Sequence, residues 1–125
     1  METVIVQDTD QAILDVLTIV LQSEGFKVYP IVSLNDNFLD IIPKIKPQVI
    51  VLDYKLKGLD SIRQCRRIKE KFPRMPILAL SCNNDIDQQH KISGFDGYMK
   101  KPFDLDHFCN TLKRYVSKKE KDLFL

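Results

Sequence analysis

Three features that mark specialised proteins are missing from this sequence. Its 125 residues contain no apolar run approaching the roughly 18 residues of a membrane span, and no signal peptide precedes the first predicted strand. The net charge is only +2, too small to indicate the concentrated basic face of a nucleic-acid-binding domain. We therefore expect no membrane segment and no direct contact with nucleic acid.

Cysteine and glycine are also scarce, and neither forms a binding motif. The three cysteines, Cys65, Cys82 and Cys109, lack C-x-x-C spacing, so they indicate reduced thiols rather than a zinc site or a disulfide framework. Gly94 and Gly97 do not form a phosphate-binding loop and are interpreted as turn residues. These features favour a cytoplasmic location.

What the sequence does contain is apolar residues, 44% of the total, arranged in short runs. Unbroken runs predict buried strands over 3–7, 49–53 and 77–81. A segment over 26–31 partly alternates and carries a proline, so it predicts a peripheral strand, and residues 98–100 predict a short fifth strand.

Helical patterns follow each of these strands. We expect helices over 11–24, 38–45, from 60 or 61 to 72, 85–93, and 105–116 with Asp104 as its cap, the fourth of them weak and polar. Ser33, with Asp36 three residues later, resembles a capping box for the second helix, which Pro43 should kink or shorten. This alternation predicts one α/β domain, a doubly wound parallel sheet with helices on both faces, followed by a charged tail over 118–125.

The centre of the predicted sheet is the run Val49–Asp53, in which four apolar residues end in a carboxylate. A run without alternation suits a strand that is buried on both faces. Asp53 therefore lies at the carboxyl end of a central strand, which is the edge where open α/β sheets bind their ligands.

Three other strands bring polar groups to the same edge. Asp8, with Gln7 beside it, ends the first strand, Ser81 ends the fourth, and Lys101 follows the fifth. Because neighbouring strands lie about 4.8 Å apart, these groups can converge with Asp53 on one ligand. Paired carboxylates suit Mg²⁺, and a hydroxyl with an ammonium suits a phosphoryl group.

In this order and spacing, the motifs resemble the receiver domain of two-component response regulators. The resemblance extends from Thr3 to about Ser117. It rests on the acidic turn at Asp8, the Asp53 strand with Gly58 and Asp60 after it, the strand ending in Ser81, and the stretch Tyr98–Phe103. It implies a flavodoxin-like fold of five parallel strands in the order 2-1-3-4-5.

The resemblance also implies chemical roles. Asp53 would accept a phosphoryl group from a phosphohistidine, and Lys101, joined to Pro102 by a cis bond, would contact a phosphoryl oxygen. Asp8 and Asp53 would ligate Mg²⁺ directly, with the backbone carbonyl of Lys55 as a third protein ligand.

Two further residues would form a switch. Ser81 would swing to hydrogen-bond the phosphoryl group, and Tyr98 would turn inward into the space that Ser81 vacates. The predicted fourth helix over 85–93, the fifth strand and the last helix would then form a surface whose partners change.

The implied partners are a sensor histidine kinase or phosphotransfer protein and a downstream protein target or output domain. The molecule would be a monomer or a weak dimer through the surface just described. It would be a regulator rather than an enzyme, although it would assist its own phosphorylation and dephosphorylation.

Three of the departures from the family pattern are expected to affect the chemistry, whereas Ser61 and Lys57, which replace a glycine and a proline, are expected to have little effect. Gln7 replaces a common acidic residue that holds metal-bound water, so its role would be indirect and we expect weaker Mg²⁺ affinity. The side chain of Lys55 is expected to overhang the site and change the lifetime of the phosphorylated state. Cys82, larger than the usual residue, is expected to crowd attacking water.

Two alternatives stay open. A pseudo-receiver would use the fold as an interaction module without phosphotransfer; Gln7 favours it, whereas Asp53, Ser81 and Lys101 oppose it. A flavodoxin-like enzyme or flavin carrier would need a hydroxyl- or glycine-rich loop after the first strand, but residues 7–10 are acidic there and would repel a phosphate.

Overall fold

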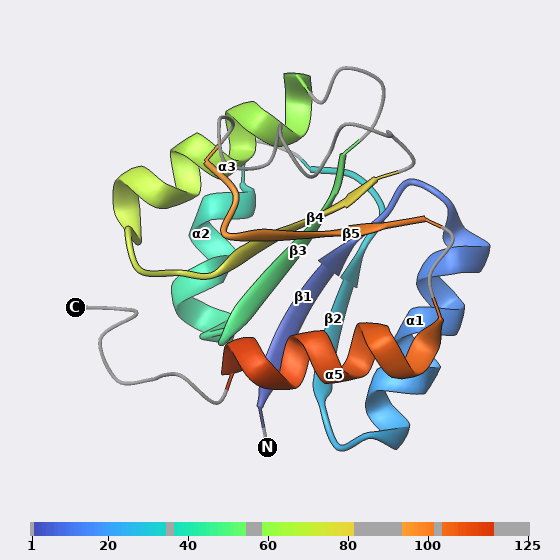
Figure 1. Ribbon diagram of the computed structural model, residues 1–125. Coiled ribbons are helices and arrows are strands. Elements are labelled where there is room, and N and C mark those ends of the chain that lie inside the picture. The colour runs from blue at the N-terminus through green and yellow to red at the C-terminus, as the bar shows by residue number, and fades with distance from the viewer. Residues whose placement is uncertain (1, 35–36, 55–58, 82–93, 102–103, 117–125) are drawn as a thin grey trace.

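The computed structural model describes residues 2–34, 37–54, 59–81, 94–101 and 104–116 (Figure 1). The strands are β1 (Thr3–Gln7), β2 (Lys27–Ile31), β3 (Val49–Tyr54), β4 (Ile77–Ser81) and β5 (Gly97–Lys100). The helices in these ranges are α1 (Gln11–Ser23), α2 (Phe38–Ile45), α3 (Leu59–Lys71) and α5 (Leu105–Val116). The helix predicted over 85–93 lies outside the described residues.

All five strands are parallel and lie in the order β2-β1-β3-β4-β5, which confirms the predicted fold class. The chain passes from β1 to β2 on one side and later returns to place β3 on the other side of β1. The order therefore reverses between β1 and β3, and open α/β sheets bind ligands outside the carboxyl ends of the strands at such a point.

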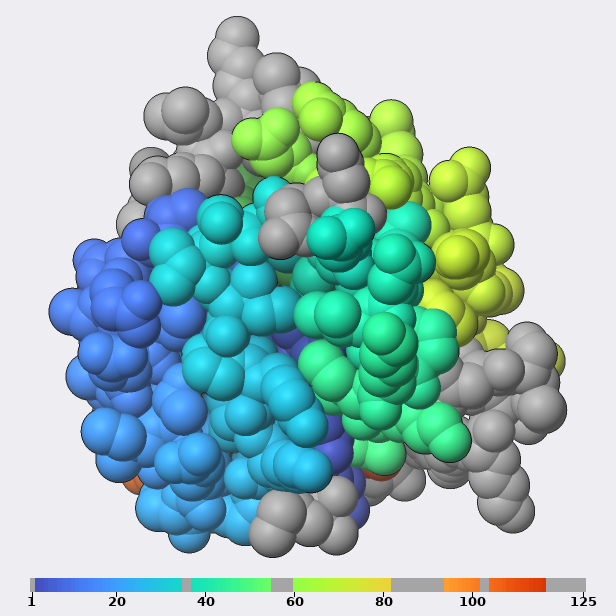
Figure 2. Space-filling model, turned by 180° about the vertical axis from the view of Figure 1, so that it is seen from behind, coloured from blue at the N-terminus to red at the C-terminus, as the bar shows by residue number. Residues whose placement is uncertain are grey.

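Two apolar layers, one on each face of the sheet, hold the helices in place. On one face, α1 and α5 bury Leu17 and Phe108 against Val6 and its neighbours. On the other face, α2 and α3 bury Ile42 and Ile68 against residues such as Ile50. In Figure 2, which looks from behind, α1, β2 and α2 follow one another across the molecule. The unbroken apolar runs follow from burial on both faces.

The outer strand β2 carries a proline that protects the edge of the sheet. The Lys27 N–H donates to Glu2 O at 2.8 Å, and Ile31 O accepts from the Asp8 N–H at 3.1 Å. Starting at Lys27, the backbone N–H and C=O groups of every second residue therefore point toward β1, and the backbone nitrogen and C=O group of Pro30 point away from the sheet. Its missing N–H costs no bond within the sheet and makes the edge a poorer template for a further strand.

The first two helices start differently. Asp10 caps α1 by accepting from the Ala12 and Ile13 N–H groups. The capping box at Ser33 is wrong, because α2 begins at Phe38, and its N-cap residue Asn37 makes no capping bond through its side chain. Within the described part of the chain, no helix is long and apolar enough to cross a membrane.

Candidate functional site

The carboxyl ends of β1, β3, β4 and β5 bring their polar residues to one edge of the sheet. In the strand register Tyr54 pairs with Ser81, and Ser81 pairs with Lys100. Asp53 therefore precedes the last residue of β3, and Lys101 follows the last residue of β5. The parallel arrangement of the sheet places these groups together, because every strand ends at the same side.

The ammonium of Lys101 joins two carboxylates. Its Nζ lies 2.8 Å from Asp8 Oδ2 and 3.3 Å from Asp53 Oδ1. Both carboxylates are buried, and the Lys101 side chain is 16% exposed. Burial disfavours the charged lysine, but the hydrogen bond to Asp8 and the charge of Asp53 outweigh it, so the pKa of Lys101 is raised above 10.5.

The remaining carboxylate oxygens also accept hydrogen bonds, which fixes both side chains. Asp8 Oδ1 accepts from the Asp10 N–H at 2.9 Å, and Thr9 Oγ1 donates to Asp53 Oδ2 at 3.2 Å. Thr9 was not among the predicted site residues. The signal that could have found it is a hydroxyl directly after Asp8, in the turn that leaves the sheet.

Gln7 is buried at the end of β1 and uses both ends of its amide. Its Oε1 accepts from the Asp53 backbone N–H at 3.1 Å, and its Nε2 donates to Val32 O at 2.9 Å. The amide therefore connects three segments of the chain at the point where the strand order reverses.

Comparison with known proteins identifies the family of this chain. A family model described as the response regulator receiver domain matches residues 4–113. The chain belongs to this family. Receiver domains are signalling regulators, so the coarse functional class follows from membership.

Several solved structures share the fold over nearly their whole length. A response regulator from Thermotoga maritima has a TM-score of 0.81 at 25% identity, covering 94% of this chain and 99% of that one. The receiver domain of a Bacteroides fragilis response regulator has a TM-score of 0.82 at 21% identity, covering 94% and 98%. Chemotaxis protein CheY4 from Vibrio cholerae has a TM-score of 0.76 at 24% identity, covering 93% and 99%.

The two predicted switch residues of this receiver domain lie on neighbouring strands. Ser81 is fully buried at the end of β4, and its carbonyl accepts from the Lys101 N–H at 2.7 Å. Tyr98 on β5 is half-buried against the apolar layer of α2 and α3. Lys55, Cys82 and Pro102, each of which carried a prediction, lie outside the described residues.

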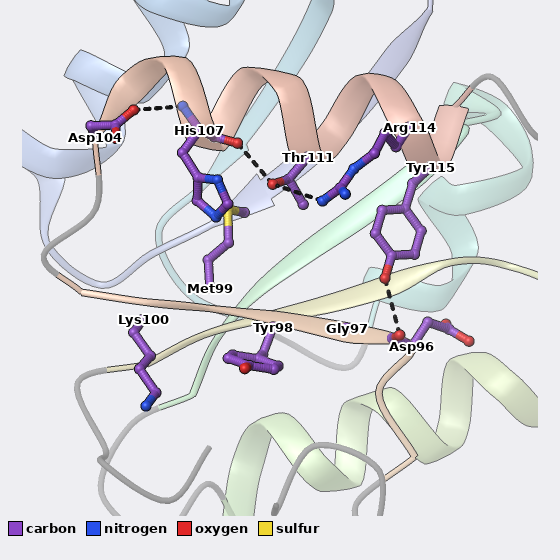
Figure 3. A pocket seen from close by; sticks show the side chains of 10 residues that line it. All are labelled: Asp96, Gly97, Tyr98, Met99, Lys100, Asp104, His107, Thr111, Arg114 and Tyr115. Carbon is purple, nitrogen blue, oxygen red and sulfur yellow. Dashed lines mark hydrogen bonds between the residues drawn. The ribbon is translucent and has the colours of Figure 1, made fainter. Parts of the chain in front are cut away.

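A hollow of about 620 Å³ lies between β5 and α5 and is separate from the acidic pair (Figure 3). Its lining includes Tyr98 and Tyr115, and the Tyr115 hydroxyl donates to Asp96 O at 3.1 Å. A Cβ atom at Gly97 would overlap that hydroxyl, so glycine allows Tyr115 to approach β5 closely. The hollow contains neither Asp8 nor Asp53.

The acidic pair fits Mg²⁺ in its ligand chemistry. Asp8 and Asp53 each direct one oxygen to the same cationic nitrogen, so their oxygens face a common point. Among the residues that the structure describes, no cluster of three or more histidine, cysteine or acidic side chains could hold a metal. Mg²⁺ is commonly bound by one or two carboxylates and keeps several waters, so two carboxylates are sufficient.

Proposed function

We propose that this receiver domain is a phosphoacceptor switch in a two-component phosphorelay. Asp53 takes a phosphoryl group from the phosphohistidine of a sensor histidine kinase or a phosphotransfer protein. The observation that carries the proposal is the contact of one ammonium, Lys101, with the carboxylates of both Asp8 and Asp53. Such a site combines a nucleophilic oxygen with a nearby positive charge.

The chemistry requires little more than positioning and charge. An oxygen of Asp53 attacks the phosphorus, the new P–O bond forms, and the P–N bond to histidine breaks. The transferred group carries its charge on the outer oxygens, which electrostatic contacts stabilise. Lys101 neutralises part of that charge, because its ammonium already lies at the Asp53 carboxylate.

Mg²⁺ would be held by the carboxylates of Asp8 and Asp53 and by the backbone carbonyl of Lys55. The ion would supply further charge neutralisation for the phosphoryl oxygens. Gln7 would act indirectly, through a metal-bound water, and its lack of negative charge weakens the affinity for the ion. The side chain of Lys55 would overhang the product, and Cys82 would shield it from water.

Phosphorylation would change the surface beside the site. The group adds about −1.5 to −2 charge and three acceptor oxygens at one point. Ser81 would bond these oxygens and Tyr98 would turn inward, which alters the surface formed by residues 82–93, β5 and α5. That surface would bind a downstream target or output domain, or a second copy in a weak dimer. The protein would act as a regulator in the cytoplasm, a reducing compartment that suits its buried thiols, Cys65 and Cys109.

Acetyl phosphate with magnesium, followed by intact mass, tests the proposal. We expect the purified chain to gain one phosphoryl group, and the Asp53→Asn variant to gain none. If the unaltered chain gains no phosphoryl group from acetyl phosphate or from a phosphorylated histidine donor, the fold assignment still holds. That result would support the pseudo-receiver alternative, in which the domain acts by binding alone.

A further inference from the structure

Gln7 makes two hydrogen bonds that a carboxylate could not make together. The side chain is only 4% exposed, so its polar atoms depend on protein partners. Its carbonyl oxygen accepts from the N–H of Asp53, and its NH₂ group donates to the carbonyl of Val32. An ionised carboxylate has no donor, so an acidic residue here would place an oxygen against the Val32 carbonyl.

The hydrogen bond from the Asp53 N–H to the Gln7 side chain lies just beyond the point where β1 and β3 stop pairing. The N–H of Ile50 faces β4, since it donates to Pro76 O at 3.0 Å. Because backbone groups alternate along a strand, the N–H of Asp53 faces β1. The paired residues of β1 and β3 end with Val6 and Val51, so the Gln7 side chain supplies an acceptor beyond the paired region.

The bond to Val32 fixes the other end of the amide. Val32 directly follows β2, and the neighbouring Ile31 carbonyl accepts from the Asp8 N–H. Two hydrogen bonds therefore attach this segment to the end of β1. With both ends held, the Gln7 amide keeps its oxygen directed at the Asp53 backbone.

We propose that Gln7 is a positioning residue for phosphoryl transfer, which holds the backbone of Asp53 so that its carboxylate stays at Lys101. This inference rests on the proposed function of Asp53 and adds a second role for Gln7 beside its indirect role toward Mg²⁺. It also gives a physical reason for an amide at this position, because the amide both accepts and donates.

Two variants separate the two ends of the amide. Gln7→Met keeps the length and removes both hydrogen bonds, whereas Gln7→Glu keeps an acceptor for the Asp53 N–H and loses the donor to Val32. The readouts are amide hydrogen exchange at Asp53 by NMR without magnesium, the backbone carbonyl shift of Val32, and the rate of phosphorylation over a range of acetyl phosphate concentrations.

In Gln7→Met we expect exchange at Asp53 to accelerate roughly tenfold, while exchange at Ile5, in the middle of β1, stays unchanged. The plateau rate of phosphorylation should fall by a similar factor, roughly tenfold, with the half-saturating acetyl phosphate concentration unchanged. In Gln7→Glu the Val32 carbonyl shift should change, exchange at Asp53 should stay near that of the unaltered protein, and the plateau rate should exceed that of Gln7→Met. Should Gln7→Met fail to fold, Gln7→Asn, which is one methylene too short to span both partners, replaces it with the same expectations.

A plateau rate in Gln7→Met equal to that of the unaltered protein overturns the inference, whether or not the Asp53 amide exchanges faster. Slow exchange at Asp53 in that variant overturns it as well. If the unaltered protein accepts no phosphoryl group from any donor, the proposed function fails, and the positioning role fails with it.

Discussion

The Nζ atom of Lys101 lies 2.8 Å from Oδ2 of Asp8, although the two residues are 93 positions apart in the chain. The same nitrogen lies 3.3 Å from Oδ1 of Asp53. Lys101, which follows the outer strand β5, thus neutralises two carboxylates at the ends of the inner strands β1 and β3. Without that cation, two buried carboxylates would face each other unpaired, which is costly in a protein interior.

Replacing Lys101 with methionine therefore tests the site most directly. Lys101→Met keeps much of the side-chain length and removes the charge, so we expect phosphorylation by acetyl phosphate to slow roughly 100-fold. The matched control is Lys100→Met, since Lys100 is exposed on the preceding position and contacts neither carboxylate. Equal rates in the two variants would contradict a role for the Lys101 charge.

The meeting of Asp8, Asp53 and Lys101 at one edge could be predicted because it depends on coarse properties of the sequence. A continuous apolar run that ends in a carboxylate indicates a central strand, and parallel strands end at the same side. The proline at position 30 likewise indicated an outer strand, and β2 is one.

The finer contacts could not be predicted, because they depend on the reach and direction of single side chains. No spacing rule indicates that Gln7 turns to the Asp53 N–H, and the hydroxyl after Asp8 marks Thr9 as a candidate without showing that it turns to the Asp53 carboxylate. The capping box at Ser33 failed for a related reason: two polar residues at the correct spacing show that a cap is available, but the position of Phe38 in the core determines where α2 begins.

The missing negative charge at Gln7 leads to a prediction on magnesium. Gln7→Asp adds a carboxylate near Asp8 and Asp53, so a Mg²⁺ titration followed by NMR should show tighter binding. The change should be modest, a few-fold, because the added group would act through water and aspartate loses the bond to Val32. Affinity unchanged by Gln7→Asp would contradict the expected weakening by glutamine.

Thr9 provides a test of how firmly the acceptor carboxylate must be held. Thr9→Val keeps the shape and removes the donor to Asp53 Oδ2, so we expect phosphorylation to slow about 3- to 10-fold. Thr9→Ser keeps a hydroxyl and should restore most of the rate. Because Thr9 is exposed, the melting temperature should stay nearly constant in both variants, and a large drop in Thr9→Val would point to a structural role instead.

Cys65 gives a prediction on pH. Burial is the main cause that raises the pKa of the Cys65 thiol from 9.0 to about 11. A group whose pKa is raised in the folded state contributes stability that is complete below pH 9.0 and is lost as the pH rises to about 11. Urea unfolding at pH 8, 9.5 and 11 should therefore show a steeper loss of stability for the unaltered protein than for Cys65→Ala. If the stability of both proteins falls equally with pH, the Cys65 thiol does not contribute to the pH dependence.

Gly97 gives a prediction on packing between β5 and α5. A Cβ atom at this position would overlap the Tyr115 hydroxyl and approach Leu78 closely, so Gly97→Ala should destabilise the fold by about 1–3 kcal/mol in urea unfolding. Tyr115→Phe removes the overlapping oxygen together with its bond to Asp96. The double variant should therefore lose less stability than the two single variants lose in total, since the alanine methyl group occupies the space that the hydroxyl leaves. Strict additivity would show that the cost of Gly97→Ala comes from its approach to Leu78 and not from the Tyr115 hydroxyl.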